Sequence, residues 1–435
     1  MNPAPLDPYV SWLRNSSTVR WQGRVTQIVG NLVESAGPFC SVGEACEISD
    51  SAGCHFPGEI VGFRGSKVLS MSLEAPQGIR FGDPIVTWGA KPSLRVGSEM
   101  QGRVIDATGR PLDGLGEYRA ARSRLVDGIA PPALERTLIS EPIGCGIRAI
   151  DGFLTCGRGQ RIGIFGGSGV GKTTLISMMA RGTAADLTVL ALVGERGREV
   201  GEFLATLGRE GLRRSVLVVS TSDQSPLLRI RAALAATAVA EYFCERGKNV
   251  LLVVDSLTRF AMAQREIGLA AGEPPTAKGY TPSVLSMLAR LVERAGRFSH
   301  GSITAFYTVL MEGDDQQDPI VDTVRSLLDG HIVLDRRLAL RNHYPPISVL
   351  DSLSRLMPKV CSSEHMQKAG ALRMLLAAYA RAEDLVKIGA YQRGTDPILD
   401  KALLALPHID RFLQQEPHEA APLESSLQQL LALPA

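Results

Sequence analysis

The chain has 435 residues, of which 45% are hydrophobic and 21% charged, and its 47 basic and 45 acidic side chains leave a net charge of +2. This composition excludes a disordered or fibrous protein, and the length predicts two or three domains because a single hydrophobic core stops growing near ~250–300 residues. The nearly balanced charge provides no overall field that would draw the chain onto nucleic acid or an anionic membrane.

The N-terminal segment, residues 1–18, lacks the long apolar core of a secretion signal, and no apolar run in the chain approaches the ~20 residues that span a bilayer. We therefore expect a cytoplasmic protein that reaches a membrane only through partners. Leu6, Tyr9, Val10 and Leu13 recur at helical spacing and predict a short amphipathic helix. A frayed terminus is the alternative interpretation.

Seven cysteines are spread along the chain without a CxxC pair, and none has the neighbours of a zinc site. We expect buried, reduced thiols, since free cysteine behaves as a small hydrophobe. The seven are Cys40, Cys46, Cys54, Cys145, Cys156, Cys244 and Cys361.

Residues 19–95 predict a small β-barrel of about six strands. Short β-branched runs such as "GRVTQIVGNLVE", "GEIVGF" and "KVLSMSL" are separated by glycine and proline. The following segment, 96–145, contains the turn-rich "DATGRPLDGLGEY" and is interpreted as a connection into the second domain.

Strand and helix patterns alternate through the rest of the second domain, which is predicted to span 96–360. The strand-like runs are "RIGIF", "LTVLALV", "SVLVVS", "NVLLVVD", "SITAFYTVL" and "HIVLD", and helical stretches cover 173–185, 199–210 and 226–245. Several of these strands are apolar throughout, which is typical of a parallel sheet covered on both faces. Residues 361–435 show only helical periodicity, with Asp396 as an expected N-cap and Pro397 at the first helical position, and predict a C-terminal helical domain.

A glycine-rich loop joins the run "RIGIF" to the helix that follows it and fits the phosphate-binding pattern GxxxxGK[ST]. Its backbone N–H groups and the helix N-terminus are suited to phosphate oxygens, Lys172 would reach the β- and γ-phosphates, and Thr173 would ligate Mg²⁺. The predicted ATP-binding residues here are Gly166, Gly167, Ser168, Gly169, Val170, Gly171, Lys172, Thr173 and Thr174.

Two acidic residues lie at the ends of strand-like runs. Asp255 ends the run "NVLLVVD" and is expected to hold the Mg²⁺ through water; a plain strand end is the alternative. Glu195 lies just past the run "LTVLALV", separated from it by Gly194, where a strand of such a sheet directs its carboxyl end toward a ligand. By composition alone Glu195 would be one more solvated charge beside Arg196, Arg198 and Glu199.

In order along the chain, "GGSGVGKT", "VGERGRE", "VVDSLTRFA", "PPTAKGYTPSVLSMLARLVERAG", "GSITAFYTVLMEGDDQQDPIVDT", "LDGHIVLDR" and "HYPPISVLDSLSRLM" resemble the flagellar and type III secretion export ATPases. These enzymes are relatives of the catalytic subunits of rotary ATP synthases. The resemblance implies an α/β fold with a RecA-like P-loop core between an N-terminal small β-barrel and a C-terminal helical domain.

The same resemblance implies roles for five further positions. Glu195 would activate the attacking water with Arg196 supporting the site, and Tyr344 would stack on adenine. Arg355 would reach the γ-phosphate bound by the neighbouring subunit, while Arg259 would lie near the phosphates. An arginine delivered across an interface implies a ring, and the family forms homohexamers.

The partners that the family implies are ATP with Mg²⁺, a stator-like regulator bound to the N-terminal segment, a central-stalk-like export protein, export chaperones with their substrates, and the membrane export gate. The loop "SGVGK" and the C-terminal stretch "IGAYQRGTDPILDKAL" favour the flagellar branch over the injectisome branch. The resulting prediction is a cytoplasmic ATPase attached peripherally to the inner membrane through these partners.

Three alternatives share parts of this pattern. A catalytic subunit of a proton-translocating rotary ATPase shares the loop, Glu195 and Tyr344, but the ending "GTDPILDKALLALPHIDRFLQQ" favours the export branch. A ring-shaped nucleic-acid translocase needs an aromatic and basic face on its barrel, whereas the basic residues of 19–95 are scattered among acids, so no nucleic-acid partner is expected. An ATP-binding switch without turnover is disfavoured by the presence of both Glu195 and Arg355.

Overall fold

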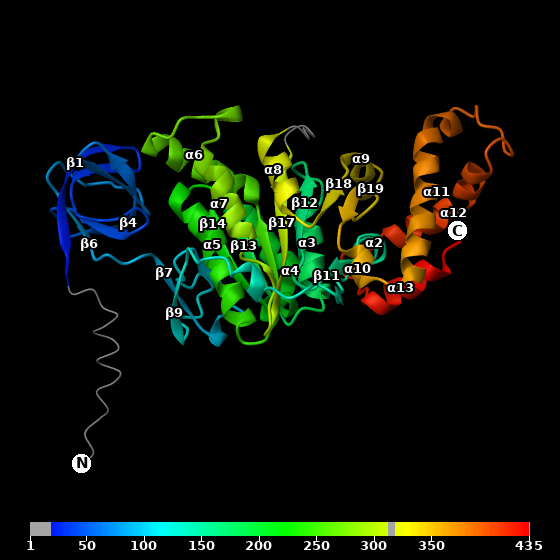
Figure 1. The fold of residues 1–435 in the computed structure, drawn as a ribbon, viewed down its shortest axis with the longest axis horizontal. Helices are drawn as coiled ribbons and strands as arrows, with labels where there is room; N and C mark the ends of the chain where they lie inside the picture. Colours follow the sequence, from blue (N-terminus) through cyan, green and yellow to red (C-terminus); the bar gives the residue numbers. More distant parts are fainter. Residues whose placement is uncertain (1–18, 312–317, 435) are drawn as a thin grey trace, which may run out of the picture.

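The computed structural model describes residues 19–311 and 318–434. It contains a β-barrel, a central sheet covered by helices, and a helical bundle at the C-terminal end of the chain (Figure 1). The predicted fold class is confirmed. The predicted helix over Leu6–Leu13 lies outside the described residues. Within the described ranges, no helix is long and apolar enough to cross a bilayer.

The N-terminal barrel is closed by six antiparallel strands in the order β1-β2-β5-β4-β3-β6. Its interior is filled by the alternating inward side chains of these strands, including Val25, Val33, Ile48, Ile60 and Ile85, all almost completely buried. The strands are β1 (Trp21–Val29), β2 (Leu32–Ala36), β3 (Ala45–Ser49), β4 (His55–Arg64), β5 (Lys67–Ser72) and β6 (Pro84–Thr87).

The stretch after the barrel holds short elements that the sequence pattern did not reveal. β7 (Ser93–Val96), which includes the predicted barrel boundary, pairs with β9 (Arg122–Leu125) outside the barrel. Within the predicted connection, β8 (Val104–Asp106) joins the central sheet beside β14 (Ser215–Thr221). The remaining short elements before the core are η1 (Ser98–Met100), η2 (Ala133–Glu135), β10 (Pro142–Ile143), β11 (Cys156–Gly157) and α2 (Arg148–Phe153).

The central sheet has the strand order β19-β18-β12-β17-β15-β13-β14-β8, with β16 (Gly296–Arg297) paired to β17. The strands from β18 through to β8 run parallel, and β19 is antiparallel to β18. The predicted strands correspond to β12 (Arg161–Gly166), β13 (Leu187–Glu195), β14, β15 (Asn249–Asp255), β17 (Ser302–Leu310) and β18 (Gly330–Leu334), and β19 spans Ile347–Ser354.

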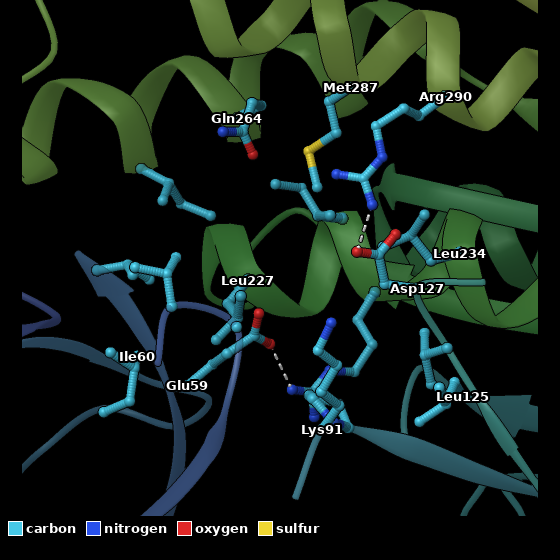
Figure 2. Close-up of a pocket in the computed structure, with 18 residues that line it drawn as sticks. Glu59, Ile60, Lys91, Leu125, Asp127, Leu227, Leu234, Gln264, Met287 and Arg290 are labelled. Carbon is cyan, nitrogen blue, oxygen red and sulfur yellow. Dashed lines mark hydrogen bonds and ion pairs between the residues drawn. The ribbon is translucent and has the colours of Figure 1, made fainter. Parts of the chain in front are cut away.

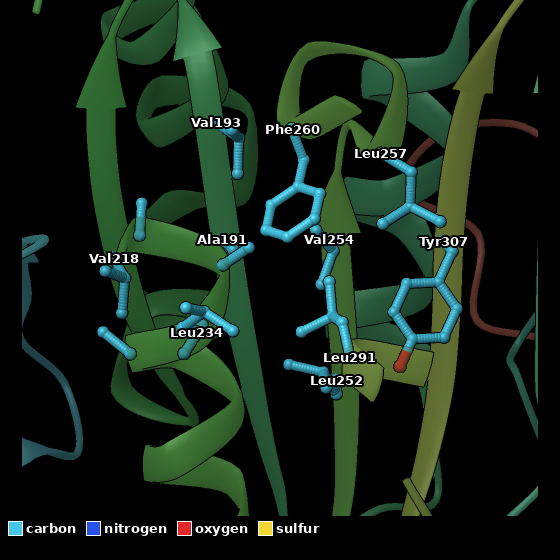
Figure 3. Packing of buried hydrophobic residues seen from close by; sticks show 14 of the residues in the cluster. Ala191, Val193, Val218, Leu234, Leu252, Val254, Leu257, Phe260, Leu291 and Tyr307 are labelled. Carbon is cyan, nitrogen blue, oxygen red and sulfur yellow. The ribbon is translucent and has the colours of Figure 1, made fainter. Parts of the chain in front are cut away.

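Both faces of this sheet are buried, which explains the uninterrupted apolar runs. In β13, Val189, Ala191 and Val193 belong to one hydrophobic cluster, while Leu190 and Leu192 belong to the cluster on the opposite face. Figure 3 shows the first cluster, where Ala191, Val193 and Val254 from the strands pack near Leu257 and Phe260. Burying one such leucine or valine stabilises the fold by about 1.5–3 kcal/mol.

Helices cover each face of the sheet. One face carries α5 (Pro226–Cys244), α6 (Leu257–Ala271), α7 (Pro282–Val292) and α8 (Pro319–Leu327), and the other carries α2, α3 (Lys172–Gly182) and α4 (Gly197–Arg213). Shorter helices are η3 (Ala277–Gly279), α9 (Arg336–Leu340) and α10 (Met357–Val360).

The C-terminal helices α11 (Ser363–Lys387), α12 (Pro397–Leu413) and α13 (Leu423–Ala432) continue the second cluster, packing against α2. Asp396 caps α12 as expected, because its side chain accepts hydrogen bonds from the N–H groups of Ile398 and Leu399.

Two ion pairs join the β-barrel and its following segment to the helices of the core. Arg231 on α5 contacts Glu59 on β4 at 2.9 Å, and Arg290 on α7 contacts Asp127 at 2.7 Å. Both pairs border a cavity of about 320 Å³ with an apolar wall that includes Leu227 (Figure 2).

The seven cysteines are all free thiols. Cys46, Cys145, Cys156 and Cys244 are buried, as expected, while Cys40 and Cys361 are half-buried. The expectation is wrong for Cys54, which is exposed because it lies in the turn before β4.

Candidate active site

The glycine-rich loop lies between β12 and α3, at the carboxyl edge of the sheet. Gly171 precedes the first residue of α3 and has a φ of 96°, a left-handed conformation that residues with a side chain rarely adopt. A Cβ atom on Gly171 would lie 3.6 Å from Cε1 of Tyr344. The backbone of the loop is therefore free to approach a ligand, and the N–H groups at the start of α3 are directed toward the same place.

Asp255, Lys172 and Thr308 meet beside this loop. The Lys172 ammonium group lies 3.3 Å from Oδ1 of Asp255, and the Thr308 hydroxyl donates to the same oxygen at 2.5 Å. Asp255 ends β15, only two strands from β12, and is 4% exposed. The ion pair between Lys172 and Asp255 therefore lies beside the loop. A phosphate would compete with Asp255 for the lysine, and a divalent cation would compete with Lys172 for the carboxylate.

The donor set fits a Mg²⁺ ion that arrives with its nucleotide. Thr173 presents an exposed hydroxyl on the first turn of α3, and Asp255 supplies a carboxylate. In the described part of the chain no group of three His, Cys, Asp or Glu residues could hold a metal ion. Mg²⁺ typically uses one or two protein oxygens and completes its shell with water and substrate phosphates.

Glu195 ends β13 and lies at the same edge of the sheet, with a side chain that is 13% exposed. Its Oε2 atom is 3.1 Å from Nη2 of Arg259, and Nη1 of Arg259 donates to the Gly194 carbonyl. Burial, a hydrogen bond with Glu199 and the charge of Asp255 raise the pKa of Glu195 to about 8, against the lowering effect of Arg259 and Lys172. The same hydrogen bond lowers the pKa of Glu199.

Tyr344 lies beside the loop and lines a pocket of about 560 Å³. The side chain is 43% exposed, and the pocket also borders Gly171 and Thr174 from the core. A flat aromatic ring that shares a pocket with a phosphate-binding loop is suited to stacking on a nucleotide base.

Arg355 lies far from the loop of its own chain. Because β19 is antiparallel to β18, Ser354 pairs with Gly330 at the amino end of β18. The Arg355 N–H donates to the Asp329 carbonyl at 3.0 Å, and Asp329 in turn bonds to Arg161, the first residue of β12. The loop follows the other end of β12, roughly 16 Å away along the strand. The exposed Arg355 side chain therefore cannot complete its own site.

Arg196 also stays outside the cluster. It is the N-cap residue of α4, and its side chain is 74% exposed and 3.9 Å from Glu199. Its supporting role remains a prediction, as do the individual roles of the loop residues, Arg259 and Tyr344.

The sequence interpretation missed several contributors to the site. Thr308 was seen only as part of a strand, and Glu199 only as one of the charged neighbours of Glu195. The segment after α12 also reaches the Tyr344 pocket, although it is about 70 residues away in the chain. Asp255 and Thr308 occupy the ends of adjacent strands, so the order of the strands is the information that would have joined them.

Known proteins match this chain over nearly its full length. The flagellum-specific ATP synthase of Bacillus subtilis (strain 168) is 49% identical over 414 residues, covering 94% of each chain. The type 3 secretion system ATPase of Sinorhizobium fredii (strain NBRC 101917 / NGR234) is 46% identical, covering 97% of this chain and 95% of its own. This chain belongs to the flagellar and type III secretion ATPases.

Family profiles place each part of this ATPase. Residues 25–89 match the beta-barrel domain and 146–354 the nucleotide-binding domain of the ATP synthase alpha/beta family. Residues 361–432 match the T3SS EscN ATPase C-terminal domain. This last match distinguishes the chain from the catalytic subunits of rotary ATPases. The sequence pattern of the core is shared with those subunits and could not make this distinction.

Solved structures of the family agree with the fold. The assembled ATPase EscN of the enteropathogenic E. coli type III secretion system superposes with a TM-score of 0.90 at 44% identity, covering 95% of this chain and all of that chain. EscN in complex with its central stalk EscO gives a TM-score of 0.88 at 43% identity, with the same coverage.

The raised pKa of Glu195 predicts the pH dependence of this ATPase. We expect kcat/KM for ATP to rise with pH to a midpoint of about 8, because a general base, the role predicted for Glu195, acts in its ionised form. Glu199→Gln is expected to lower this midpoint, since it removes the hydrogen-bonded carboxyl group that, after burial, contributes most to the raised pKa of Glu195. Initial rates measured between pH 6 and pH 9.5, buffered at constant ionic strength, test both statements; a midpoint below ~6, or one that Glu199→Gln leaves in place, would contradict them.

The same shift has a consequence for stability. Between the ordinary value of 4.5 and about 8, the native state holds a proton on Glu195 that the unfolded chain releases. The contribution of Glu195 to stability therefore falls as the pH rises through this window.

Proposed function

We propose that this chain is the ATP-hydrolysing motor of a flagellar-type protein export apparatus, and that it acts as a homohexamer with sites shared between neighbouring subunits. The observation that carries the proposal is the separation of the site into two halves. Lys172, Glu195 and Asp255 gather at the carboxyl edge of the sheet, while Arg355 is exposed at the opposite edge. A neighbouring copy in the assembly can supply the missing arginine.

Each residue of the first half has a task in phosphoryl transfer. The loop N–H groups and Lys172 hold the phosphates, Thr173 and Asp255 hold the Mg²⁺, and Tyr344 stacks on adenine. Glu195 accepts a proton from the water that attacks the γ-phosphate, and Arg259 orients Glu195 through their 3.1 Å contact. When bound, Mg²⁺ neutralises charge on the phosphate oxygens. Arg355 of the next subunit would stabilise the negative charge that spreads over the transferred group.

The proposed partners follow from the relatives. EscN was solved as an assembly and with its central stalk EscO, which supports a hexamer and a central-stalk-like partner here. We further propose that a stator-like regulator binds the N-terminal segment, and that hydrolysis releases export chaperones and drives substrates into the membrane export gate. The ATPase would then be cytoplasmic and peripheral at the inner membrane.

The choice of the flagellar branch rests on the "SGVGK" loop and the stretch "IGAYQRGTDPILDKAL". Relatives of both branches match with similar identity, for example 49% for the Bacillus subtilis protein and 46% for the Sinorhizobium fredii protein. An injectisome ATPase is therefore the second candidate, with the same reaction at the same site.

A shared site predicts that activity depends on assembly. We expect the ATPase activity per subunit to increase steeply with protein concentration, in parallel with the hexamer fraction measured by mass photometry on the same samples. The physical reason is that an isolated subunit lacks the arginine of its neighbour. Equal specific activity in samples that contain only monomer and samples that contain only hexamer would rule out the shared site.

A further inference from the structure

The pocket beside Tyr344 has a second wall that comes from the C-terminal helical domain. Gln414, Gln415 and Pro417, which follow α12, border the pocket together with Gly171 and Thr174. We call residues 412–419 the pocket segment. A base stacked on Tyr344 would therefore be enclosed only if the pocket segment is held in place.

Gln415 connects the pocket segment to Tyr344 and to the core. Its backbone N–H donates to the Tyr344 carbonyl at 2.9 Å. Its side-chain amide donates to the Gly146 carbonyl at 2.8 Å and accepts from the Arg148 N–H at 2.9 Å. Gln415 is 4% exposed, so these bonds are formed away from water and define one position for the segment.

Arg148, the first residue of α2, binds the same segment through its guanidinium group. Nε donates to the Phe412 carbonyl at 3.0 Å, Nη2 donates to the Gln414 carbonyl and to Oε2 of Glu419, and Nη1 donates to Oε1 of Glu419. The residue is 7% exposed. Arg148 itself lines the pocket beside Tyr344, but its Nε, Nη1 and Nη2 atoms each donate to the pocket segment, so its guanidinium group is engaged in holding that segment.

The turn that carries Arg148 is held together by hydrogen bonds of its own. The buried carboxylate of Asp151 accepts the N–H groups of Cys145 and Gly146 at 2.8 and 3.1 Å. Residues 145–151 therefore form a rigid base, and the pocket segment is attached to it. Arg181 donates a further hydrogen bond to the Pro417 carbonyl at 2.6 Å. This bond attaches the later part of the pocket segment and involves none of residues 412–415.

We propose that Arg148 and Gln415 are positioning residues for nucleotide binding: they hold the pocket segment against Tyr344 and so set the affinity for the base and ribose, without contributing to the phosphate site. This proposal rests on the proposed function, since it takes the pocket beside Tyr344 as the place of the ATP base.

The test separates base binding from phosphate binding in the hexameric enzyme. In Arg148→Met and Gln415→Met we expect the Kd for Mg-ADP and the KM for ATP to rise about tenfold, as the segment loses several buried hydrogen bonds. We expect kcat to change less than about threefold and the inhibition constant of Mg-pyrophosphate, which has no base, to stay at the wild-type value. Circular dichroism and mass photometry establish that each variant is folded and assembled.

Arg373→Met is the matched control. The Arg373 guanidinium joins α11 to the Phe153 carbonyl at 2.8 Å, at the same junction between the C-terminal helices and α2, and has no bond to the pocket segment. Its loss should leave the Kd for Mg-ADP within about twofold of wild type. An equal effect of Arg373→Met would overturn the proposal, because it would show a general loosening of the junction.

Two other results would also overturn it. One is an unchanged Kd for Mg-ADP in the Gln415 and Arg148 variants. The other is a parallel rise of the Mg-ADP and Mg-pyrophosphate constants, which would mean that the whole site had been disturbed. A wild-type hexamer that neither binds Mg-ADP nor hydrolyses ATP would instead refute the proposed function, and this inference with it.

Discussion

Replacing Arg355 by alanine is expected to lower the kcat for ATP hydrolysis by about a thousandfold, because a guanidinium group beside the transferred phosphoryl group contributes ~10³ or more in rate. The Kd for Mg-ADP should change little, since the loop, Tyr344 and Asp255 are intact in each subunit. The measurement is steady-state hydrolysis by the assembled variant, with Mg-ADP binding followed in parallel. Activity within tenfold of wild type would contradict the assigned role.

Mixed rings decide whether Arg355 acts in the neighbouring subunit. Arg355→Ala keeps the loop but lacks the arginine, and Lys172→Ala lacks the loop lysine but keeps Arg355. When equal amounts of the two inactive variants assemble together, about one site in four has both parts intact. We therefore expect activity to return on mixing, whereas a mixture that stays as inactive as its components would place Arg355 in the site of its own chain.

Replacing Glu195 by glutamine is expected to lower kcat by about 10²- to 10⁴-fold, the usual contribution of a general base. Glutamine has nearly the same shape but does not accept the proton from water. Binding of Mg-ATP should persist, and equilibrium binding with single-turnover kinetics would separate the two steps. In cells the variant should stop export by the type III apparatus, which under the proposed flagellar assignment means export of flagellar subunits.

Arg198→Gln is the control for this variant. Arg198 lies three residues beyond Glu195, its side chain is 76% exposed, and it pairs only loosely with Glu202 at 3.4 Å. Its substitution should leave hydrolysis unchanged. If Glu195→Gln were as active as Arg198→Gln, the base would have to be another residue.

The phosphate-binding loop and the strands of the core could be predicted because their causes are local. The apolar runs ending at Glu195 and Asp255 reflect strands buried on both faces, and the spacing from Gly166 to Thr173 reflects backbone geometry at a helix start. The short strand β8 was not predictable in the same way. It contributes three residues within a turn-rich segment, and it forms a strand by pairing with β14, which is more than 100 residues further along the chain.

From periodicity and spacing within a few residues, the sequence alone therefore predicted the barrel, the parallel-sheet core, the C-terminal helices and the loop with Lys172, and it placed Glu195 and Asp255 at strand ends; the role of Glu195 came from the resemblance to the export ATPases. The tertiary structure decided how these residues meet. It placed Thr308 on Asp255 and Glu199 beside Glu195, and it set Arg355 at the far end of the sheet. It also brought the segment after α12 to Tyr344. These contacts depend on strand order and on helix packing between distant parts of the chain, which no local pattern encodes.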